Sequence, residues 1–439
     1  MKRILVRAGR SSLALLLAIS ATVWSPRSAS AQLSECAQAA FEEAIGLEDL
    51  ILFECDGTIL LTNTVTIENN LTIDGTGHDI TFASPGSTNG VRLFTVAEGV
   101  TLTLINVKLV DGIDTNGAAI FVSPEAILDA TRCFFSNNAA LAFNGLSGKS
   151  ASTNETVRLG KDGRDGQAGG SAAGGAIYNL GQVFLNECRF VTNIVAGGNG
   201  GDGGNGGDGT FTGGDGGKGG RGGSAMGGAI YNAGELFATN CTFQEGRAVG
   251  GLGGLGGLGG DSPFPGKDGR GGPGGPTSGA GILTTRYGSA TIVNSTFSFN
   301  GAASGDSAAA ESRTPTSKTG PNGPQSSGGG LASYGKNILI NCSFFANVAI
   351  GGAGGQGGAV AFRGGKGGQG GAAWGGSVFS GGKAARFYAT NCTFSDGGAI
   401  GGTNGPGGSG AFPGDDGKRG VSRGANICNR TDYFISTTP

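Results

Sequence analysis

Histidine is almost absent from this 439-residue chain, and proline and charged residues are sparse. The single histidine, His78, argues against a metal site or a Ser-His relay, because such sites use several imidazoles or a matched set of partners. Only 13 Pro accompany 94 Gly, which excludes collagen, a fold that needs strict Gly-X-Y triplets rich in Pro. Charged residues make up 14% of the chain and the net charge is −2. We therefore expect no nucleic-acid partner, since such proteins present basic surfaces.

The N-terminus has the pattern of a secretory signal peptide. Four basic residues lie in the first ten positions, and an apolar run covers residues 13–24. Ala29-Ser30-Ala31 is a small-x-small cleavage site. We predict a signal peptide at 1–31 and an exported mature chain, secreted or on the cell surface, of bacterial origin. An interfacial helix that stays attached is the alternative. No later stretch is apolar enough to span a bilayer as a helix, so we expect no integral membrane span.

Export permits disulfides, and the eight cysteines are even in number. Cys36 and Cys55 are close in sequence and could pin an N-terminal cap. Because no two cysteines have CxxC spacing, we expect no zinc or redox site and no cofactor. Five others occupy equivalent places in a repeat: Cys133, Cys188, Cys241, Cys342 and Cys392. Burial as small apolar side chains is the favoured interpretation for these five, and bridges between neighbouring repeats are the alternative.

The repeat itself is about 50 residues long. GGAIYN occurs at 174–179 and again at 227–232, with degenerate copies starting at residues 279, 328 and 375. Each copy is followed by a strand-like stretch and a Cys-or-Ser-x-Phe element, and these elements begin at residues 133, 188, 241, 295, 342 and 392. Self-similarity at such a period is typical of stacked repeat architectures.

Alternation of side chains predicts strands that turn corners. Leu236, Ala238 and Asn240 share one parity, whereas Cys241 and Phe243 share the other. Side chains on a straight strand alternate with period two, so a change of parity marks a bend. We expect the corner residues to stack as an asparagine ladder and the phenylalanines to stack inside. The ladder residues are Asn240, Asn294, Asn341 and Asn391, with Phe243, Phe297, Phe344 and Phe394.

These features predict an all-β fold, a right-handed parallel β-helix in which each rung buries its apolar side on its neighbours. Short alternating strands without inserts fill residues 47–144. Residues 36–46 have helical spacing, and we assign 32–46 as a cap over the open end of the solenoid. We assign rungs with glycine-rich insertions to 145–430 and a C-terminal tail to 431–439.

The paired motifs resemble a known group of surface proteins. GGA-I followed by FxxN, as at Phe190–Asn193, Phe297–Asn300 and Phe344–Asn347, is similar to the repeats of chlamydial polymorphic outer-membrane proteins and related autotransporter-like passengers. The N-terminal GTI…LTIDG pattern resembles exported β-helices of the pectin-lyase-like superfamily. The resemblance covers roughly residues 36 to 430 and implies a surface-exposed β-helix.

Long glycine-rich inserts separate the repeats, most regularly at 196–228, 249–279 and 350–376. They show a Gly-Gly-x period of three with a break near each midpoint. Flexible loops are one interpretation, because glycine loses the most backbone entropy on ordering. A period of three also matches an extended polyproline-II-like helix, whose backbone groups point sideways. We favour stacked polyglycine-II-like hairpins that hydrogen-bond to one another beside the β-helix.

The hairpin turns carry aromatic residues, and basic residues follow them. The aromatics are Phe211, Phe264, Phe362 and Phe412. The basic pairs three residues apart are Lys218/Arg221, Lys267/Arg270, Arg363/Lys366 and Lys161/Arg164, and Lys418/Arg419 is an adjacent pair. A spacing of three places both members of a pair on one edge of a three-per-turn helix. Either these charges solubilise a flat glycine surface, or tips and charges together recognise a glycan or envelope polysaccharide.

The sequence thus predicts an exported β-helix with a binding or structural, adhesin-like role and no catalysis, and self-association of copies is open. A polysaccharide lyase or hydrolase is the alternative, for which Asp74, Asp79, Asp111 and Asp114 lie in the N-terminal rungs with Arg92 and His78. An ice-binding protein is a third class, since bundled Gly-Gly-x helices resemble a glycine-rich arthropod antifreeze. Its ice-binding face should carry small Thr, Ala or Ser side chains, whereas the x residues here include Asn, Asp, Leu, Lys and Arg.

Overall fold

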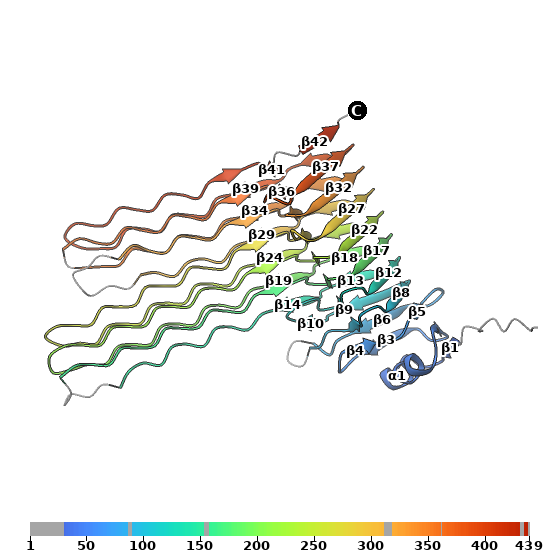
Figure 1. Cartoon of the computed structure of the whole chain (residues 1–439), viewed down its shortest axis with the longest axis horizontal. Coiled ribbons are helices and arrows are strands. Elements are labelled where there is room, and N and C mark those ends of the chain that lie inside the picture. Colours follow the sequence, from blue (N-terminus) through green and yellow to red (C-terminus); the bar gives the residue numbers. More distant parts are fainter. Residues whose placement is uncertain are drawn as a thin grey trace, which may run out of the picture.

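The computed structural model describes residues 30–86, 90–152, 158–310, 318–360, 362–430 and 434–437. It is a right-handed parallel β-helix from which glycine-rich hairpins extend to one side as a bundle (Figure 1). The described residues form five sheets in which every strand pair is parallel. The fold class predicted from the repeat is therefore confirmed.

The strands of each sheet follow one another up the solenoid axis, and their bounds are as follows. Sheet A contains β1 (Ser30–Leu33), β2 (Leu50–Phe53), β5 (Leu71–Asp74), β8 (Thr101–Ile105), β12 (Ile127–Thr131), β17 (Gln182–Asn186), β22 (Glu235–Thr239), β27 (Ser289–Val293), β32 (Lys336–Ile340), β37 (Arg386–Thr390) and β42 (Phe434–Thr437). Sheet B contains β3 (Gly57–Leu60), β6 (Ile80–Ala83), β9 (Val107–Val110), β13 (Phe134–Ser136), β18 (Arg189–Val191), β23 (Thr242–Gln244), β28 (Thr296–Ser298), β33 (Ser343–Phe345) and β38 (Thr393–Ser395).

Sheet C contains β4 (Val65–Ile67), β7 (Phe94–Val96), β11 (Ile120–Val122), β16 (Ile177–Asn179), β21 (Ile230–Asn232), β26 (Ile282–Thr284), β31 (Leu331–Ser333), β36 (Val378–Ser380) and β41 (Ile427–Asn429). Sheet D contains β10 (Ile113–Asp114), β14 (Ala139–Leu141), β19 (Ile194–Ala196), β24 (Arg247–Val249), β29 (Gly301–Ala303), β34 (Val348–Ile350) and β39 (Gly398–Ile400). Sheet E contains β15 (Ala172–Ala173), β20 (Ala225–Met226), β25 (Thr277–Ser278), β30 (Ser326–Ser327), β35 (Ala373–Trp374) and β40 (Ser422–Arg423).

The corner between sheets A and B explains the change of parity in the sequence. Leu236 and Ala238 of β22 point into the core, and Asn240 then adopts a left-handed backbone with φ 56°. Asparagine tolerates this conformation better than most residues. The bend turns the chain so that Cys241 and Phe243 are buried as well.

Identical side chains stack from rung to rung at this corner. Asn294 donates to Asn240 at 3.3 Å, Asn341 to Asn294 at 3.0 Å, and Asn391 to Asn341 at 2.8 Å. The inner rings lie nearly parallel, with centroid separations of 4.7 Å for Phe243–Phe297, 4.5 Å for Phe297–Phe344 and 5.0 Å for Phe344–Phe394. The register of the strands, which follows the repeat, thus brings each predicted ladder residue onto its counterpart.

A second set of asparagines is buried and was missed by the sequence analysis. Asn193 accepts a hydrogen bond from Asn138 at 3.0 Å, and Asn347 accepts one from Asn300 at 2.8 Å. These are the asparagines of the FxxN motif, and all four are at most 1% exposed. Their amides also bond to backbone groups, as where Asn138 donates to the carbonyl of Leu109 at 3.0 Å. The motif therefore satisfies backbone groups at a buried corner.

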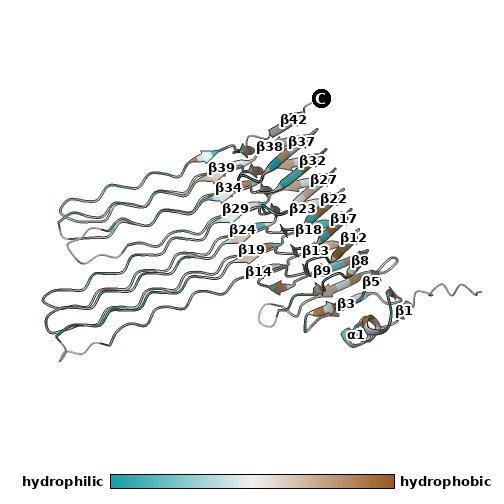
Figure 2. Ribbon diagram, viewed as in Figure 1, coloured by the Kyte–Doolittle hydropathy of each residue, from teal (hydrophilic) through white to brown (hydrophobic). Residues whose placement is uncertain are grey.

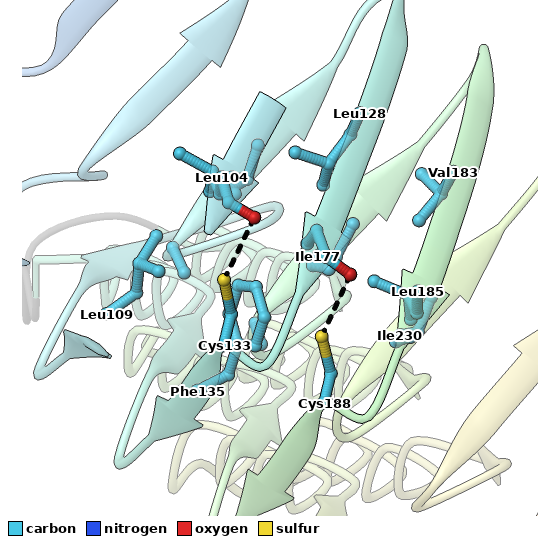
Figure 3. Close-up of a cluster of buried hydrophobic side chains, with 14 of the residues drawn as sticks. Leu104, Leu109, Leu128, Cys133, Phe135, Ile177, Val183, Leu185, Cys188 and Ile230 are labelled. Atoms are coloured by element: carbon cyan, nitrogen blue, oxygen red, sulfur yellow. Dashed lines mark hydrogen bonds between the residues drawn. The ribbon is translucent and has the colours of Figure 1, made fainter. Parts of the chain in front are cut away.

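The size of the inward side chains decreases from the β-helix toward the hairpins. The main core contains phenylalanine, leucine, isoleucine and valine together with the cysteines of the repeat (Figure 3). A separate cluster between sheets D and E contains only alanine and one valine: Ala140, Ala172, Val195, Ala225, Ala248, Ala280 and Ala302. Beyond these sheets the hairpins continue with glycine. Apolar residues accordingly concentrate in the strands of the solenoid (Figure 2).

The N-terminal cap consists of α1 (Gln38–Leu47) and β1. Phe41 of α1 is buried against Phe82 at a centroid distance of 4.9 Å. Cys36 and Cys55 form a disulfide with Cα atoms 5.9 Å apart. The helix ends one residue beyond the predicted cap of 32–46, and β1 begins at Ser30. Residues 1–29 of the predicted signal peptide lie outside the described residues, and of the predicted tail the backbone of 434–437 is described.

Candidate functional site

The glycine-rich inserts are ordered hairpins that bond to one another through their backbones. Each has an outgoing arm that leaves sheet D and a return arm that enters sheet E (Figure 1). In the second insert, Gly217 of the return arm donates to Gly204 of the outgoing arm at 2.8 Å, and Gly220 donates to Gly201 at 2.7 Å. Gly204 donates in turn to Arg164 of the preceding hairpin at 2.8 Å. The bonds recur every third residue, as three residues per turn require.

Close backbone contact explains why glycine fills two of every three positions. A Cβ built on Gly217 would lie 2.0 Å from the carbonyl oxygen of Arg164. One built on Gly254 would lie 2.1 Å from that of Gly201. Such distances are far shorter than any van der Waals contact, so a side chain at these positions would force the arms apart. The glycines are thus required by packing between arms.

The remaining residue of each triplet points outward, and two surfaces result. We call the surface of the outgoing arms the outgoing face and that of the return arms the return face. Outgoing arms cover 142–152, 197–210, 250–262, 304–310, 351–360 and 401–411, and return arms cover 158–171, 212–224, 264–276, 318–325, 362–372 and 412–421. On the described outgoing arms Lys149 is the one basic residue, whereas Lys and Arg recur along the return arms. The basic side chains of the bundle therefore collect on the return face.

Acidic and amide side chains of the triplets bond to the neighbouring hairpin. Asp162 accepts from the backbone N–H of Asp215 at 2.7 Å, and Asp215 accepts from that of Lys267 at 2.7 Å. Asn199 plays the same part for Leu252 on the outgoing face, at 2.9 Å. These N–H groups lie between the glycine bonds, so the side chains complete the hydrogen bonding of each arm. The sequence pattern alone does not distinguish this role of the aspartates from that of countercharges to the basic pairs.

Three successive hairpins bring basic side chains together in two adjoining hollows of the return face. The first, of about 440 Å³, is lined by Lys218, Lys267, Arg270 and Lys318, together with Asp215 and Asp268. The second, of about 390 Å³, is lined by Lys218, Arg221 and Arg270 with prolines and Asn322. Four of the predicted basic residues thus meet at one place. Arg363 and Lys366 lie on the fifth hairpin and do not line either hollow.

Lys318 belongs to this group although the sequence analysis did not select it. Lys318 begins the described return arm of the fourth hairpin. The Gly-Gly-x pattern is weak there, so the period of three did not identify this lysine. Burial lowers the pKa of the Lys318 ammonium, while Asp268 and Asp215 oppose that change. The neighbouring Lys267 lowers the pKa further. The lowered pKa thus reflects mainly the partial burial of Lys318 in the hollow that it lines with Lys267.

The basic side chains that line the hollows form no ion pair with a described residue. The ion pairs between described residues are Arg92–Asp114, Lys108–Asp79 and His78–Asp56, all in the N-terminal rungs. Lys218, Lys267 and Arg270 are exposed. The Asp215 carboxylate beside them accepts a backbone N–H, as described above. In the first hollow the four basic side chains face two carboxylates, those of Asp215 and Asp268, so the basic groups are in excess.

The four tip phenylalanines form two pairs. Phe211 and Phe264 have centroids 4.8 Å apart, and Phe362 and Phe412 have centroids 5.3 Å apart. They are 42 to 70% exposed, and Arg158 lies over the Phe211 ring at 4.9 Å. The tip residues 311–317 of the fourth hairpin, between these pairs in sequence, are outside the described residues. No tip phenylalanine lines either basic hollow, so the aromatic pairs and the hollows are separate features of the bundle.

The residues considered for catalysis lie in the N-terminal rungs, where they form ion pairs and turn hydrogen bonds. Arg92 binds Asp114 at 3.0 Å and donates to the carbonyls of Gly117 and Asn116. Its pKa is lowered by burial and raised by Asp114. Asp79 pairs with Lys108 at 2.6 Å, and His78 lies 3.5 Å from Asp56. Asp74 accepts from the backbone of Thr76 at 2.8 Å, as in an Asx-turn.

The described residues lack both a cluster of metal-ligating side chains and a helix able to cross a membrane. They contain no cluster of three or more His, Cys, Asp or Glu side chains placed to hold a metal ion. Among their helices, none combines the length and the apolar character that crossing a membrane demands.

Comparisons with known proteins place the chain in no family. No family model matches it, and no curated protein matches it. Similar solved structures include jun a 1, the major allergen from cedar pollen, with 10% identity over 69% of this chain and 58% of the allergen, at a TM-score of 0.21. The catalytic domain of a GH87 alpha-1,3-glucanase has 9% identity over 94% of this chain and 68% of that domain, at 0.23.

A third similar structure is the nine polyproline type II helical bundle springtail antifreeze protein from Granisotoma rainieri. It has 17% identity over 61% of this chain and 96% of that protein, at a TM-score of 0.11. All three scores are far too low to carry an argument about function. The parallel β-helix architecture therefore rests on the strand order and register of the chain itself.

Proposed function

We propose that this protein is an exported binding platform whose return face holds an acidic polysaccharide. The observation that carries the proposal is the meeting of Lys218, Lys267, Arg270 and Lys318 from three hairpins around adjoining hollows. An extended anionic chain could contact both hollows at once, because Lys218 and Arg270 line both. Several weak charge contacts along one polymer add up to useful affinity.

The bundle supports this role because it holds its side chains in fixed rows. Backbone bonds join neighbouring arms at every third residue, and carboxylates such as Asp215 bond the intervening N–H groups. Little conformational entropy of the backbone is then lost when a ligand binds. The β-helix serves as the rigid base from which all arms extend in one direction (Figure 1).

The exposed aromatic pairs suit a second contact at the tips. Sugar rings pack on aromatic faces through their C–H groups, and Phe362 is 70% exposed. In this proposal the return face supplies charge and the tips supply apolar contact. An adhesin-like location on a cell surface is part of the same proposal, and the predicted signal peptide at 1–31 supports the export that this location requires.

The test is retention of the purified protein on immobilised polysaccharides. We expect binding to polygalacturonate or alginate, weaker binding at high salt, and no binding to dextran, because exposed charges are screened by ions. A triple variant, Lys218→Gln, Lys267→Gln and Arg270→Gln, should lose about tenfold in affinity, equivalent to about 1.4 kcal/mol. The matched control is Lys218→Arg, Lys267→Arg and Arg270→Lys, which keeps the charge.

A second variant separates the two contacts, and a second readout separates binding from catalysis. Changing Phe211, Phe264, Phe362 and Phe412 to Ser should weaken binding less than the charge variant does. Equal retention of the wild type and the Gln variant would overturn the role of the return face. Release of shortened chains by the wild type would instead favour the lyase or hydrolase alternative and direct attention to the N-terminal rungs.

A further inference from the structure

The cysteines of the repeat form a column inside the corner between sheets A and B, interrupted by one serine. Cys133, Cys188 and Cys241 are at most 1% exposed, and Ser295 follows them in the next rung. Cys342 and Cys392 come next and are separated from the first three by this serine. The serine thus divides the column into a buried group of three and a pair near the last strand of sheet B.

The two cysteines of the pair lie at matching places in adjacent rungs. Ile340 pairs with Thr390 before them, and Ser343 pairs with Thr393 after them. The backbone N–H of Cys342 donates to Sγ of Cys392 at 3.4 Å. Neighbouring parallel strands are about 4.8 Å apart, and disulfides span Cα separations of about 4.4–6.8 Å. The rung spacing therefore fits a bridge.

Cys392 differs from the other column members in its access to solvent. It is partly exposed, whereas Cys342 is 2% exposed and the three earlier cysteines are buried. In the described residues the strand order of sheet B ends at β38, directly after Cys392, so no further strand of this sheet covers it. A reagent in solution can reach this sulfur first.

The environment of Cys392 also favours its reactive form. The adjacent Cys342 side chain is the main cause that lowers the pKa of the Cys392 thiol, and the backbone N–H of Cys342 acts in the same direction. Burial works against this effect. Because the thiolate is the attacking species, a lowered pKa makes Cys392 the more reactive thiol of the pair. By contrast, the same contact and burial raise the pKa of Cys342.

We propose that Cys342 and Cys392 are an oxidation site that closes to an inter-rung disulfide, taking a disulfide oxidant as its co-reactant. The Cys392 thiolate attacks one sulfur of the oxidant, forms a mixed disulfide and releases one thiolate. The sulfur of Cys342, after losing its proton, attacks Sγ of Cys392 and releases the second thiolate. Two thiols of the chain are oxidised to one disulfide, and the oxidant is reduced to two thiols.

The bridge would secure the C-terminal rungs as the Cys36–Cys55 disulfide secures the N-terminal cap. Outer rungs have a neighbour on one side only, so they open more easily than central rungs. A covalent link from β37–β38 back to β32–β33 removes that freedom. Its loop spans the 50 residues that separate Cys342 from Cys392, including the fifth hairpin.

The experiment oxidises the purified, folded full chain with glutathione disulfide and maps the peptides by mass spectrometry after trapping free thiols. We expect a Cys342–Cys392 cross-link with the loss of two hydrogens and slower proteolysis of the C-terminal rungs. Cys188 and Cys241 are the internal control, since they occupy adjacent rungs of the same column but are buried. They should stay free and unlabelled until the protein is denatured.

Serine variants supply the matched controls, because Ser295 shows that serine is accommodated in this column. Cys342→Ser should stop the reaction at the mixed disulfide of Cys392 with glutathione, and Cys392→Ser should leave both products absent. Alkylation of Cys392 in the wild type should accelerate as pH rises and should reach its plateau at a lower pH than alkylation of an ordinary exposed thiol, because its pKa is lowered. The proposal is overturned if the wild type accumulates only the mixed disulfide, or if Cys188 and Cys241 cross-link as fast as the pair.

Discussion

The β-helix and the hairpin bundle stack the same repeats in the same register, yet different groups hold them together. In the β-helix, side chains fill the space between strands, as the ring stack from Phe243 to Phe394 shows. In the bundle, the backbones of neighbouring arms mostly contact each other directly, and few side chains, such as those of Asp268, Pro321 and Pro324, lie between arms. The alanine cluster between sheets D and E is the transition. The same repeat therefore forms two kinds of stacked structure. The size of the side chains between neighbouring repeats decides whether side chains or backbone groups make the contacts.

The largest effect should come from removing a side chain from the β-helix. Phe243→Ala deletes a fully buried ring between Phe190 and Phe297. We expect a loss of about 3–5 kcal/mol in the free energy of unfolding, because removal of the ring leaves a cavity that the neighbouring rungs cannot fill. Denaturant unfolding measures it. The control is Phe237→Ala in the same rung, which removes an outward ring that is 39% exposed. Equal losses for both variants would contradict the proposed role of the inner stack.

The bundle should show the opposite sensitivity, since adding atoms damages it. Gly217→Ala places a methyl group 2.0 Å from the carbonyl of Arg164 and forces the arms to separate. We expect a local loss of a few kcal/mol as several backbone bonds of roughly 1 kcal/mol each break. Hydrogen exchange should accelerate in the second hairpin and its neighbours but not in sheets A and B. The neighbouring Lys218→Ala keeps the glycines and should leave exchange unchanged. Unaltered exchange in the Gly217 variant would show that the arms are not tightly packed.

Periodicity explains why so much of this fold could be predicted. A change of parity at Asn240 is visible in the sequence, and the left-handed backbone at that residue is its structural cause. Repeats of about 50 residues fix the register, so the position of Phe243 also fixes that of Phe297. The Gly-Gly-x period likewise indicates three residues per turn. Each of these properties is set by the spacing of residues along the chain, and this spacing can be read directly from the sequence.

The candidate site was predicted less completely because it depends on distances between hairpins. The basic pairs were visible as motifs, but the hollow that joins Lys218 to Lys267 and Lys318 requires the lateral register of three arms. The grouping of tip aromatics into two pairs has the same origin. The bonding of Asp215 to the next arm was missed for a further reason. A carboxylate at a triplet position has the same sequence pattern whether it serves as a countercharge or accepts a backbone N–H.

The smallest effect should come from this aspartate, and it distinguishes those two roles. Asp215→Ala removes the acceptor for the backbone N–H of Lys267, a bond of 2.7 Å. We expect a loss of about 0.5–1.5 kcal/mol and faster exchange of the Lys267 amide, since the N–H loses its partner. Asp215→Asn keeps an acceptor oxygen and removes the charge, and Asn199 and Asn205 already play this part for other arms. If Asn behaves like Asp, hydrogen bonding is the role of the side chain; if Asn behaves like Ala, the countercharge is.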